Sequence, residues 1–194
     1  YRMDGAPPLR ARPMGPVLAG IRTLGAEVRD EGEPGCLPVT VVAPGGLDGG
    51  EVAVAGDTSS QFLSGLLLAA PYARDGVRLR LTTALVSRPY VELTLAVMRA
   101  FGVDVPGEAG GPVLEVPAGR YRATAYAVEP DASTASYFLA AAALVGGRVI
   151  VSGLGAGTRQ GDARLADVLA AMGAQVERTA TSTTVVGSGR LRGL

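Results

Sequence analysis

The residues best suited to chemistry lie at the start of an apolar segment, in Gly56-Asp57-Thr58-Ser59-Ser60-Gln61. Ser59, Ser60 and Gln61 stand directly before the hydrophobic run 62–72, which has the composition of a buried helix. Hydroxyl donors, free backbone N–H groups and the positive end of a helix dipole together suit a phosphate or a carboxylate. Ser and Asp are also common helix N-caps, so this segment alone leaves capping and anion binding both open.

Two further segments place polar side chains ahead of an expected helix. Ser87-Arg88-Pro89-Tyr90 offers a hydroxyl and a cation, although Pro in a first turn also has a purely structural use. Arg10 and Arg12 precede another helix start, where a guanidinium repels the dipole unless an anion is present. Surface Arg is common, so exposure in a loop is the alternative for this pair.

Other polar segments are better explained by structure than by chemistry. Residues 158–162, Thr-Arg-Gln-Gly-Asp, are expected to form a turn and cap the helix that follows them. Asp131 and the hydroxyl residues after it are expected to cap a second apolar helix, which includes the run 137–145. Cys36 is expected to be an unreactive loop or core thiol.

Composition excludes several classes of function. The chain has no His and no Lys, so a Ser-His nucleophile pair and imidazole metal ligands are excluded, and one Cys cannot form an intrachain disulfide. A formal net charge of zero gives no field for nucleic acid or an anionic membrane. The longest apolar runs are short for a membrane span and are expected to be buried helices. A cytoplasmic setting fits these features, and the opening at Tyr1 predicts an excerpt of a longer protein.

The elements that position these side chains repeat along the chain. An amphipathic helix running into a Gly and then a short strand is predicted in 16–28, 91–105 and 165–176. Gly25, Gly102 and Gly173 occupy the C-cap positions at intervals of roughly 70 to 77 residues, which suits one supersecondary unit each.

Short apolar or alternating segments separated by Gly and Pro predict the strands of the repeat. They are residues 39–42, 52–55, 77–81, 113–116, 123–128 and 149–151. The fold class is therefore α/β (α+β), built of repeated units, and sequence alone leaves open whether helices lie under the sheets or in ordinary layers. The turn at Glu129-Pro130-Asp131 predicts a domain crossover, with one domain in 1–128 and another in 129–194.

Taken together, the segments resemble the EPSP synthase (3-phosphoshikimate 1-carboxyvinyltransferase) family, in the same order and over nearly the whole chain. The matching motifs are Arg-x-Arg-Pro-Met-Gly, Ser-Ser-Gln-Phe-Leu, Leu-Val-Ser-Arg-Pro-Tyr, Glu-Pro-Asp-Ala-Ser-x-Ala-Ser-Tyr-Phe-Leu and Gln-Gly-Asp. Each motif is weak alone, but their joint order is specific. The resemblance implies a two-domain enzyme of βαβαββ units with helices packed under mixed sheets. Residues 1–128 would be the later part of one domain, with about two units of which the first is incomplete, and 129–194 the first unit of the other.

The resemblance also implies an activity and the residues that serve it. The family transfers the enolpyruvyl group of phosphoenolpyruvate to the 5-hydroxyl of shikimate 3-phosphate, without a metal or organic cofactor. By position, Ser59, Ser60, Gln61, Ser87 and Tyr90 would bind shikimate 3-phosphate. Arg12 and Gln61 would contact phosphoenolpyruvate.

Two departures from the family pattern limit this assignment. The segment Ala6-Pro7-Pro8-Leu9 leaves the placement of Arg10 uncertain, and Arg88 replaces a common Lys while keeping the charge. The lysines and the acid–base carboxylate of the family have no counterpart here, so the chain alone is expected to be inactive and no catalytic residue is assigned.

Two other functions compete with this interpretation. One is the related enolpyruvyl transferase acting on UDP-N-acetylglucosamine, against which the Ser59–Gln61 and Ser87–Tyr90 motifs argue. The other is a noncatalytic phosphate-binding repeat module, because fold alone does not fix function. The full-length protein is expected to be a monomer, whereas unpaired apolar edges could make this chain self-associate.

Overall fold

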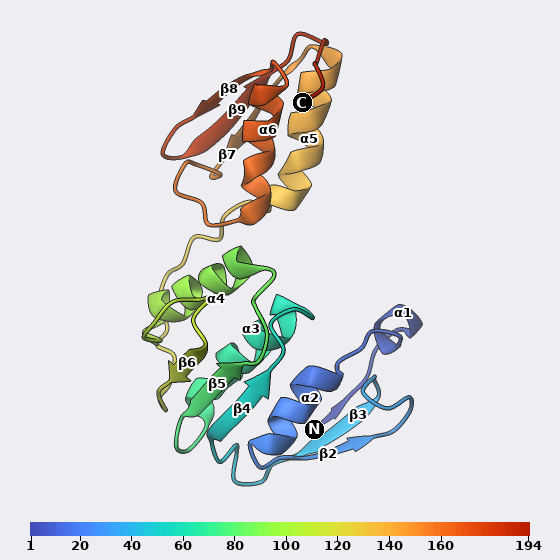
Figure 1. The fold of residues 1–194 in the computed structure, drawn as a ribbon, viewed down its shortest axis with the longest axis vertical. Coiled ribbons are helices and arrows are strands. Elements are labelled where there is room, and N and C mark those ends of the chain that lie inside the picture. Colours follow the sequence, from blue (N-terminus) through green and yellow to red (C-terminus); the bar gives the residue numbers. More distant parts are fainter. The chain divides into compact units, whose positions relative to one another are not determined.

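The computed structural model describes all of residues 1–194, which form two units, Tyr1–Thr124 and Ala125–Leu194. Each unit is built of helices packed against small sheets, as Figure 1 shows for each by itself. The elements follow the predicted repeat of helix, strand, helix and strands.

Unit 1 contains two three-stranded sheets and a layer of helices. The first sheet is antiparallel in the order β1-β3-β2, with β1 at Arg2–Met3, β2 at Glu27–Asp30 and β3 at Val39–Val42. The second has the order β4-β5-β6, with β4 at Gly50–Val54, β5 at Val77–Leu81 and β6 at Val113–Val116. β4 and β5 are parallel and β6 is antiparallel to β5, so this sheet is mixed.

The helices of unit 1 begin at sequence signals that are easy to recognise. They are α1 (Pro7–Arg10), α2 (Gly15–Thr23), α3 (Ser60–Ala69), the 3₁₀ turn η1 (Ala70–Tyr72) and α4 (Arg88–Ala100). Pro lies in the first turn of α2 and of α4, where its missing N–H costs nothing. Gly25 and Gly102 follow α2 and α4 with positive φ, as the C-cap pattern predicts.

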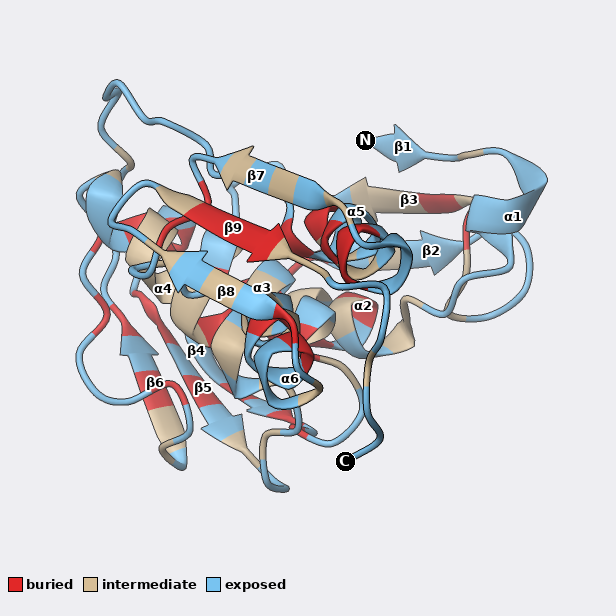
Figure 2. Cartoon of the chain, turned by 90° about the horizontal axis from the view of Figure 1, so that it is seen from above, coloured by how far each residue is buried: buried red, intermediate tan, exposed pale blue.

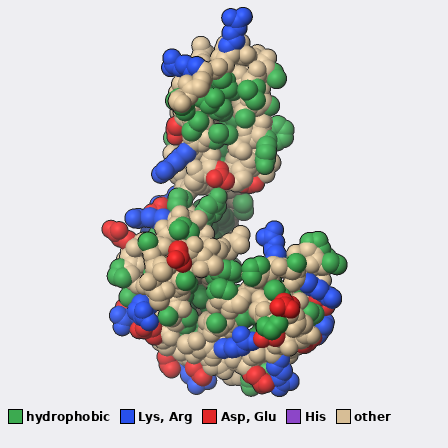
Figure 3. Space-filling model, turned by 45° about the vertical axis from the view of Figure 1, so that its right-hand side comes forward, with side chains coloured by type: hydrophobic (Ala, Val, Ile, Leu, Met, Phe, Trp, Pro, Cys, Tyr) green, Lys and Arg blue, Asp and Glu red, His purple; other side chains and the backbone are tan.

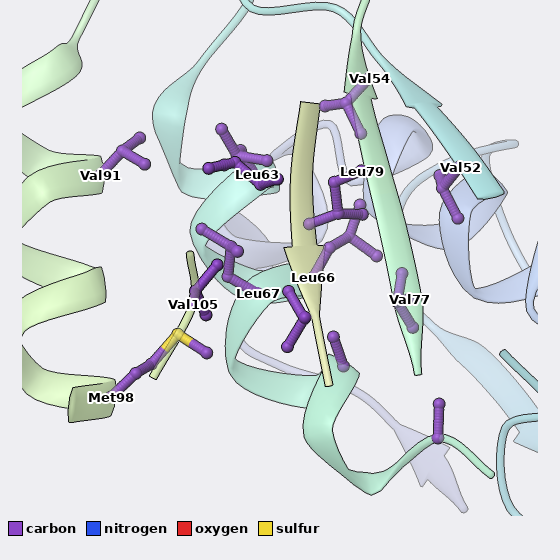
Figure 4. Packing of buried hydrophobic residues seen from close by; sticks show 14 of the residues in the cluster. Val52, Val54, Leu63, Leu66, Leu67, Val77, Leu79, Val91, Met98 and Val105 are labelled. Carbon is purple, nitrogen blue, oxygen red and sulfur yellow. The ribbon is translucent and has the colours of Figure 1, made fainter. Parts of the chain in front are cut away.

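The core of unit 1 lies between α3, α4 and the mixed sheet. Leu63 and Leu67 of α3 lie among side chains of α4 and β5 in Figure 4, and Leu66 belongs to the same buried cluster and lies next to Gly20 of α2. Burying an aliphatic side chain of this size contributes about 1.5–3 kcal/mol relative to leaving it in water. This packing fixes where α3 and α4 begin, which matters for the candidate site.

Unit 2 holds one antiparallel sheet in the order β7-β9-β8, with helices on one face. Its elements are α5 (Ala132–Val145), β7 (Arg148–Ser152), the 3₁₀ turn η2 (Gly161–Arg164), α6 (Leu165–Ala171), β8 (Gln175–Arg178) and β9 (Ser182–Val186). Figure 2 shows that the buried residues of β9 and α5 face each other. Gly146 ends α5 in the left-handed conformation.

Three of the predictions about strands and burial are wrong. Residues 103–105 form no strand, because the Val103 N–H donates to the Met98 carbonyl and completes the end of α4 instead. Residues 123–128 also form no strand; every second residue there is Ala, which offers little apolar area to bury. Finally, the run 137–145 is not fully buried, since Tyr137, Phe138, Leu144 and Val145 are exposed on α5.

No helix of the structure combines the length and the apolar character needed to cross a bilayer.

Candidate anion-binding site

The candidate site is built at the carboxyl ends of two parallel strands. β4 leads into α3 and β5 leads into α4, and the two strands pair in register from Gly50 with Val77 to Val54 with Leu81. Because parallel strands end at the same edge of a sheet, the two helices that follow begin side by side. Ser59–Gln61 and Ser87–Tyr90 are these two helix starts.

Hydrogen bonds tie the two connecting loops together. The Gly56 and Asp57 N–H groups donate to Thr83 Oγ1 at 2.9 and 3.1 Å, and the Val86 N–H donates to the Gly56 carbonyl at 3.1 Å. A Cβ on Gly56 would lie 2.7 Å from the Thr83 carbonyl oxygen, so only Gly allows this approach. The structure therefore brings together the two segments that the sequence separates by almost thirty residues.

The helices themselves are also joined just below their first turns. The hydroxyls of Ser64 on α3 and Thr94 on α4 are 2.8 Å apart, and Thr94 Oγ1 also donates to the Tyr90 carbonyl at 2.9 Å. Neither helix has an acidic residue in its first turn, so the positive dipole ends are not compensated by a carboxylate there. Two adjacent, uncompensated helix starts suit an anion.

Ser59, Ser60 and Gln61 take different positions at the start of α3. Ser59 is the N-cap, and its Oγ accepts a hydrogen bond from the Gln61 N–H at 3.2 Å, as the capping interpretation predicts. Ser60 is one of the few buried polar side chains of the protein, whereas the Gln61 side chain is exposed. Capping uses one acceptor of Ser59 and leaves its hydroxyl proton available, so capping and anion binding are compatible here.

Ser87 is the N-cap of α4, but its side chain makes no capping hydrogen bond. Arg88, by contrast, does not offer a free charge. Its Nε bonds Glu92 Oε1 at 2.7 Å and its Nη2 lies 3.6 Å from Glu108 Oε2. The hydrogen bond to Glu92 raises the pKa of Arg88 above its usual value. The positive charge of Arg88 is thus neutralised by Glu92 and Glu108 of the same chain.

The two arginines before α2 also differ. Arg10 makes two hydrogen bonds with Asp4, at 2.7 Å each, and this pairing holds the pKa of the Asp4 carboxyl below its ordinary value. The expected need for an external anion therefore does not apply to Arg10. Arg12 is exposed and forms no ion pair.

Arg12 precedes α2 at the same end of unit 1 as the start of α3. The Leu24 carbonyl after α2 and the Asp75 N–H after α3 both bond the backbone of Asp48, so the two helices end close together. Because the C-terminal ends of α2 and α3 lie together, the N-terminal ends of these two neighbouring helices also lie at one end of the helix layer. No hydrogen bond joins Arg12 to Ser59, Ser60 or Gln61 in this structure.

The polar segment 158–162 belongs to unit 2 and does not cap its own helix as predicted. Gln160 Oε1 accepts from the Ala132 N–H at 2.8 Å, and its Nε2 donates to Glu129 and to the Pro130 carbonyl, both at 2.9 Å. The Asp131 carboxylate caps α5 as predicted, accepting from the Ser133 and Thr134 N–H groups. Glu129, Asp131 and Gln160 together satisfy this helix start from within the chain.

No group of three or more His, Cys, Asp or Glu side chains is arranged to hold a metal ion. Thr83, which aligns the two loops with Gly56, was missed by sequence reasoning, and no signal in the sequence could have found it. Gly56 was named as the first residue of the candidate segment, but its role in bringing the loops together was not predicted.

The sequence and fold match one family throughout. The EPSP synthase (3-phosphoshikimate 1-carboxyvinyltransferase) family model matches residues 1–194. The chain belongs to the EPSP synthase family. The 3-phosphoshikimate 1-carboxyvinyltransferase from Solanum lycopersicum, named as chloroplastic, is 46% identical over 192 residues, which are 98% of this chain and 37% of that protein. The enzyme of that name from Shewanella loihica is 44% identical over 179 residues, 91% of this chain and 42% of its own length.

A solved EPSP synthase from Acinetobacter baumannii superposes with a TM-score of 0.75 at 29% identity, covering 100% of this chain and 44% of that one. The mixed α/β architecture predicted from the sequence is thereby confirmed. The chain spans between about a third and a half of the length of these EPSP synthase relatives.

Proposed function

We propose that the longer protein to which residues 1–194 belong transfers an enolpyruvyl group from phosphoenolpyruvate to the 5-hydroxyl of shikimate 3-phosphate, releasing phosphate. Unit 1 supplies the binding site for shikimate 3-phosphate. The pairing of the α3 and α4 starts through Gly56, Thr83 and Val86 is the observation that carries this proposal. Membership of the EPSP synthase family supports it.

The proposed roles follow from the chemistry of each group. Ser59, Ser60, Gln61 and Ser87 donate hydrogen bonds to shikimate 3-phosphate, with the helix dipoles favouring its phosphate. Tyr90, in the first turn of α4, lines the same pocket. The hydrogen bonds between the two loops hold the helix starts together before the ligand arrives, which lowers the cost of ordering the loops on binding.

Arg12 is proposed to pair with phosphoenolpyruvate, and Gln61 to reach the same molecule. Arg12 is suited to this role because its guanidinium has no carboxylate partner, unlike Arg10 and Arg88. A guanidinium fork binds a carboxylate or phosphate through two parallel hydrogen bonds.

The proposed domain assignment keeps the boundaries expected from the sequence. Residues 1–128 form the later part of the domain that binds shikimate 3-phosphate, and residues 129–194 form the crossover and the first unit of the other domain. The remaining acid–base chemistry belongs to parts of the longer protein outside these residues. The chain alone is proposed to bind shikimate 3-phosphate and to turn it over very slowly or not at all.

The full-length protein is proposed to act as a monomer in the cytoplasm, with phosphoenolpyruvate and shikimate 3-phosphate as its small-molecule partners. Because the tomato relative is named as chloroplastic, the compartment stays a prediction. The UDP-N-acetylglucosamine reaction, the related alternative, is not favoured by any feature of the paired helix starts.

Calorimetric titration of the chain with shikimate 3-phosphate tests the proposal. The Ser59→Ala/Ser60→Ala double variant should bind at least about tenfold more weakly, since hydrogen bonds to charged groups contribute about 1.5–3 kcal/mol each. Thr23→Ala, which removes an exposed hydroxyl at the C-terminal end of α2, is the control and should bind like the wild type. Equal affinities of the double variant and the wild type would overturn the assignment of this site.

A further inference from the structure

Two hydroxyl groups form a directed chain of hydrogen bonds between α3 and α4, just below the candidate site. Ser64 Oγ lies 2.8 Å from Thr94 Oγ1, and Thr94 Oγ1 donates to the Tyr90 carbonyl at 2.9 Å. A hydroxyl has only one hydrogen to donate, and Thr94 gives its own to Tyr90. Ser64 is therefore the donor to Thr94, and the chain runs from α3 through Thr94 to the first turn of α4.

The bond from Ser64 is the part of this chain that α4 by itself does not explain. A Thr inside a helix often bonds the carbonyl four residues before it, as Thr23 of α2 does with the Ala19 carbonyl at 3.1 Å. Ser64, however, lies 30 residues before Thr94, so its hydrogen bond links two helices.

The rest of the contact between α3 and α4 is largely apolar. Leu63 and Leu67 of α3 lie across from Val91 and Met98 of α4 in Figure 4, and all four side chains are buried. Apolar burial is non-directional, so it holds the helices together but specifies their relative position less sharply than a hydrogen bond does. A hydrogen bond is limited in both distance and angle. The hydroxyl pair is thus the directional contact between these helices.

The hydroxyl pair lies one turn below two residues of the candidate site. Ser64 follows Ser60 by four residues on α3, and Thr94 follows Tyr90 by four residues on α4. Residues four apart lie on nearly the same face of a helix, separated by about 6 Å along its axis. A shift between Ser64 and Thr94 is therefore passed on to the distance between Ser60 and Tyr90.

The surface charges of unit 1 contribute little to attracting an anion from a distance. Figure 3 shows Arg and acidic side chains interspersed over the visible face of this unit, without a broad positive patch. A mixed surface of this kind produces no strong field for an anion. Affinity then depends on how well the local donors fit the ligand, and so on the spacing of the two helix starts.

We propose that Ser64 and Thr94 are positioning residues for the candidate site. Their hydrogen bond sets the register of α3 against α4 and, through it, the spacing of Ser60 from Tyr90. Both hydroxyls lie below the first turns of their helices, so they act through these two residues and not by touching the ligand. This role rests on the proposed function, because the ligand that the spacing serves is shikimate 3-phosphate.

Amide NMR of the chain without ligand tests the register of the two helices. Thr94→Val replaces the hydroxyl with a methyl group of similar size, whereas Thr94→Ser keeps the hydroxyl and removes the methyl. Thr94→Val should shift the amide resonances of residues 58–62 on the other helix, and Thr94→Ser should leave them near their wild-type positions. Unchanged resonances in Thr94→Val, or equal shifts in the two variants, would show that the hydroxyl does not set the register.

Calorimetric titration with shikimate 3-phosphate tests the effect on binding. Ser64→Ala and Thr94→Val should each weaken binding by about three- to tenfold, since losing one neutral hydrogen bond misplaces the ligand donors without removing any of them. The double variant should bind no more weakly than the weaker single variant, because both changes remove the same bond. Thr94→Ser should bind like the wild type, a rescue that depends on the hydroxyl alone.

Thr23→Val is the matched control, because it removes the same kind of hydroxyl-to-carbonyl bond from α2 without touching α4. Its affinity should equal that of the wild type. Wild-type affinity in Ser64→Ala and Thr94→Val, or additive losses in the double variant, would overturn the positioning role. A folded wild-type chain that binds no shikimate 3-phosphate would instead count against the proposed function, and the amide shifts of the free chain would still decide whether the hydroxyl pair sets the register.

Discussion

Gln160 Oε1 accepts a hydrogen bond from the Ala132 N–H at 2.8 Å, so a side chain 28 residues further along the chain holds the first turn of α5. The Nε2 atom of the same amide binds Glu129 and the Pro130 carbonyl. The two motifs, Glu-Pro-Asp and Gln-Gly-Asp, thus form one structural unit. In unit 1 the corresponding helix start, that of α3, lacks such internal partners and is the one we assign to a ligand.

Gln160→Ala should destabilise unit 2 by about 1–3 kcal/mol, because the partly buried Ala132 N–H loses its acceptor. Urea unfolding followed by circular dichroism measures the change. Arg159→Ala is the matched control, since the neighbouring Arg159 makes no hydrogen bond or ion pair and its loss should leave the midpoint unchanged. Equal losses in the two variants would contradict the bridging role of Gln160.

The stability of α5 should depend on pH through Asp131. Hydrogen bonds from the Thr134 hydroxyl and from the Ser133 and Thr134 N–H groups hold the pKa of Asp131 below its ordinary value. The ionised cap therefore stabilises the fold above the unfolded pKa of about 4, and this contribution is lost as the pH falls through the lower folded value.

Asp131→Asn provides the comparison. The unfolding midpoint of the wild type should exceed that of the variant at neutral pH, and the difference should shrink below pH of about 4. An unchanged difference down to strongly acidic pH would exclude Asp131 as the titrating cap.

Leu66→Ala should cost about 2–5 kcal/mol of the unfolding free energy of unit 1, because the side chain fills the contact between α3 and Gly20. Leu68→Ala on the same helix removes a half-exposed side chain and should cost far less. Chemical denaturation of both variants checks this, and similar losses would mean that α2 does not pack on α3 as described.

Gly56→Ala should weaken binding of shikimate 3-phosphate by about tenfold or more while leaving the chain folded. The added Cβ would lie 2.7 Å from the Thr83 carbonyl oxygen, which forces the two loops apart and separates the two helix starts. Gly157→Ala, where a Cβ meets nothing within 4 Å, is the matched control. Calorimetry of both variants makes the comparison, and wild-type affinity in Gly56→Ala would show that loop pairing does not position the ligand.

The sequence was sufficient for helices α2 to α6 and for most strands, but it predicted neither the short α1 nor the strands β1 and β9. Helices α2, α4 and α6 show apolar periodicity and a Gly end signal, and both are local properties of the chain. Residues 103–105 were mistaken for a strand because their apolar character suits a strand and the end of a helix equally well. The hydrogen bond from the Val103 N–H to the Met98 carbonyl shows that they complete the end of α4.

The electrostatics of the candidate site could not be predicted in the same way. Arg10, Arg12 and Arg88 are alike in sequence, yet Asp4 and Glu92 neutralise two of them and leave Arg12 unpaired. Such pairings depend on side-chain geometry, which spacing along the chain does not specify. The role of Thr83 is likewise set by the register of β4 and β5, a relationship between distant segments.

The most direct test of the account is amide NMR mapping of the chain during titration with shikimate 3-phosphate. The account predicts that shifts concentrate in residues 58–62 and 86–90, at the starts of α3 and α4, and that the start of α5 at residues 131–134 stays unchanged. Shifts centred on 131–134, or none in a folded chain at millimolar ligand, would contradict the assignment of this site to unit 1.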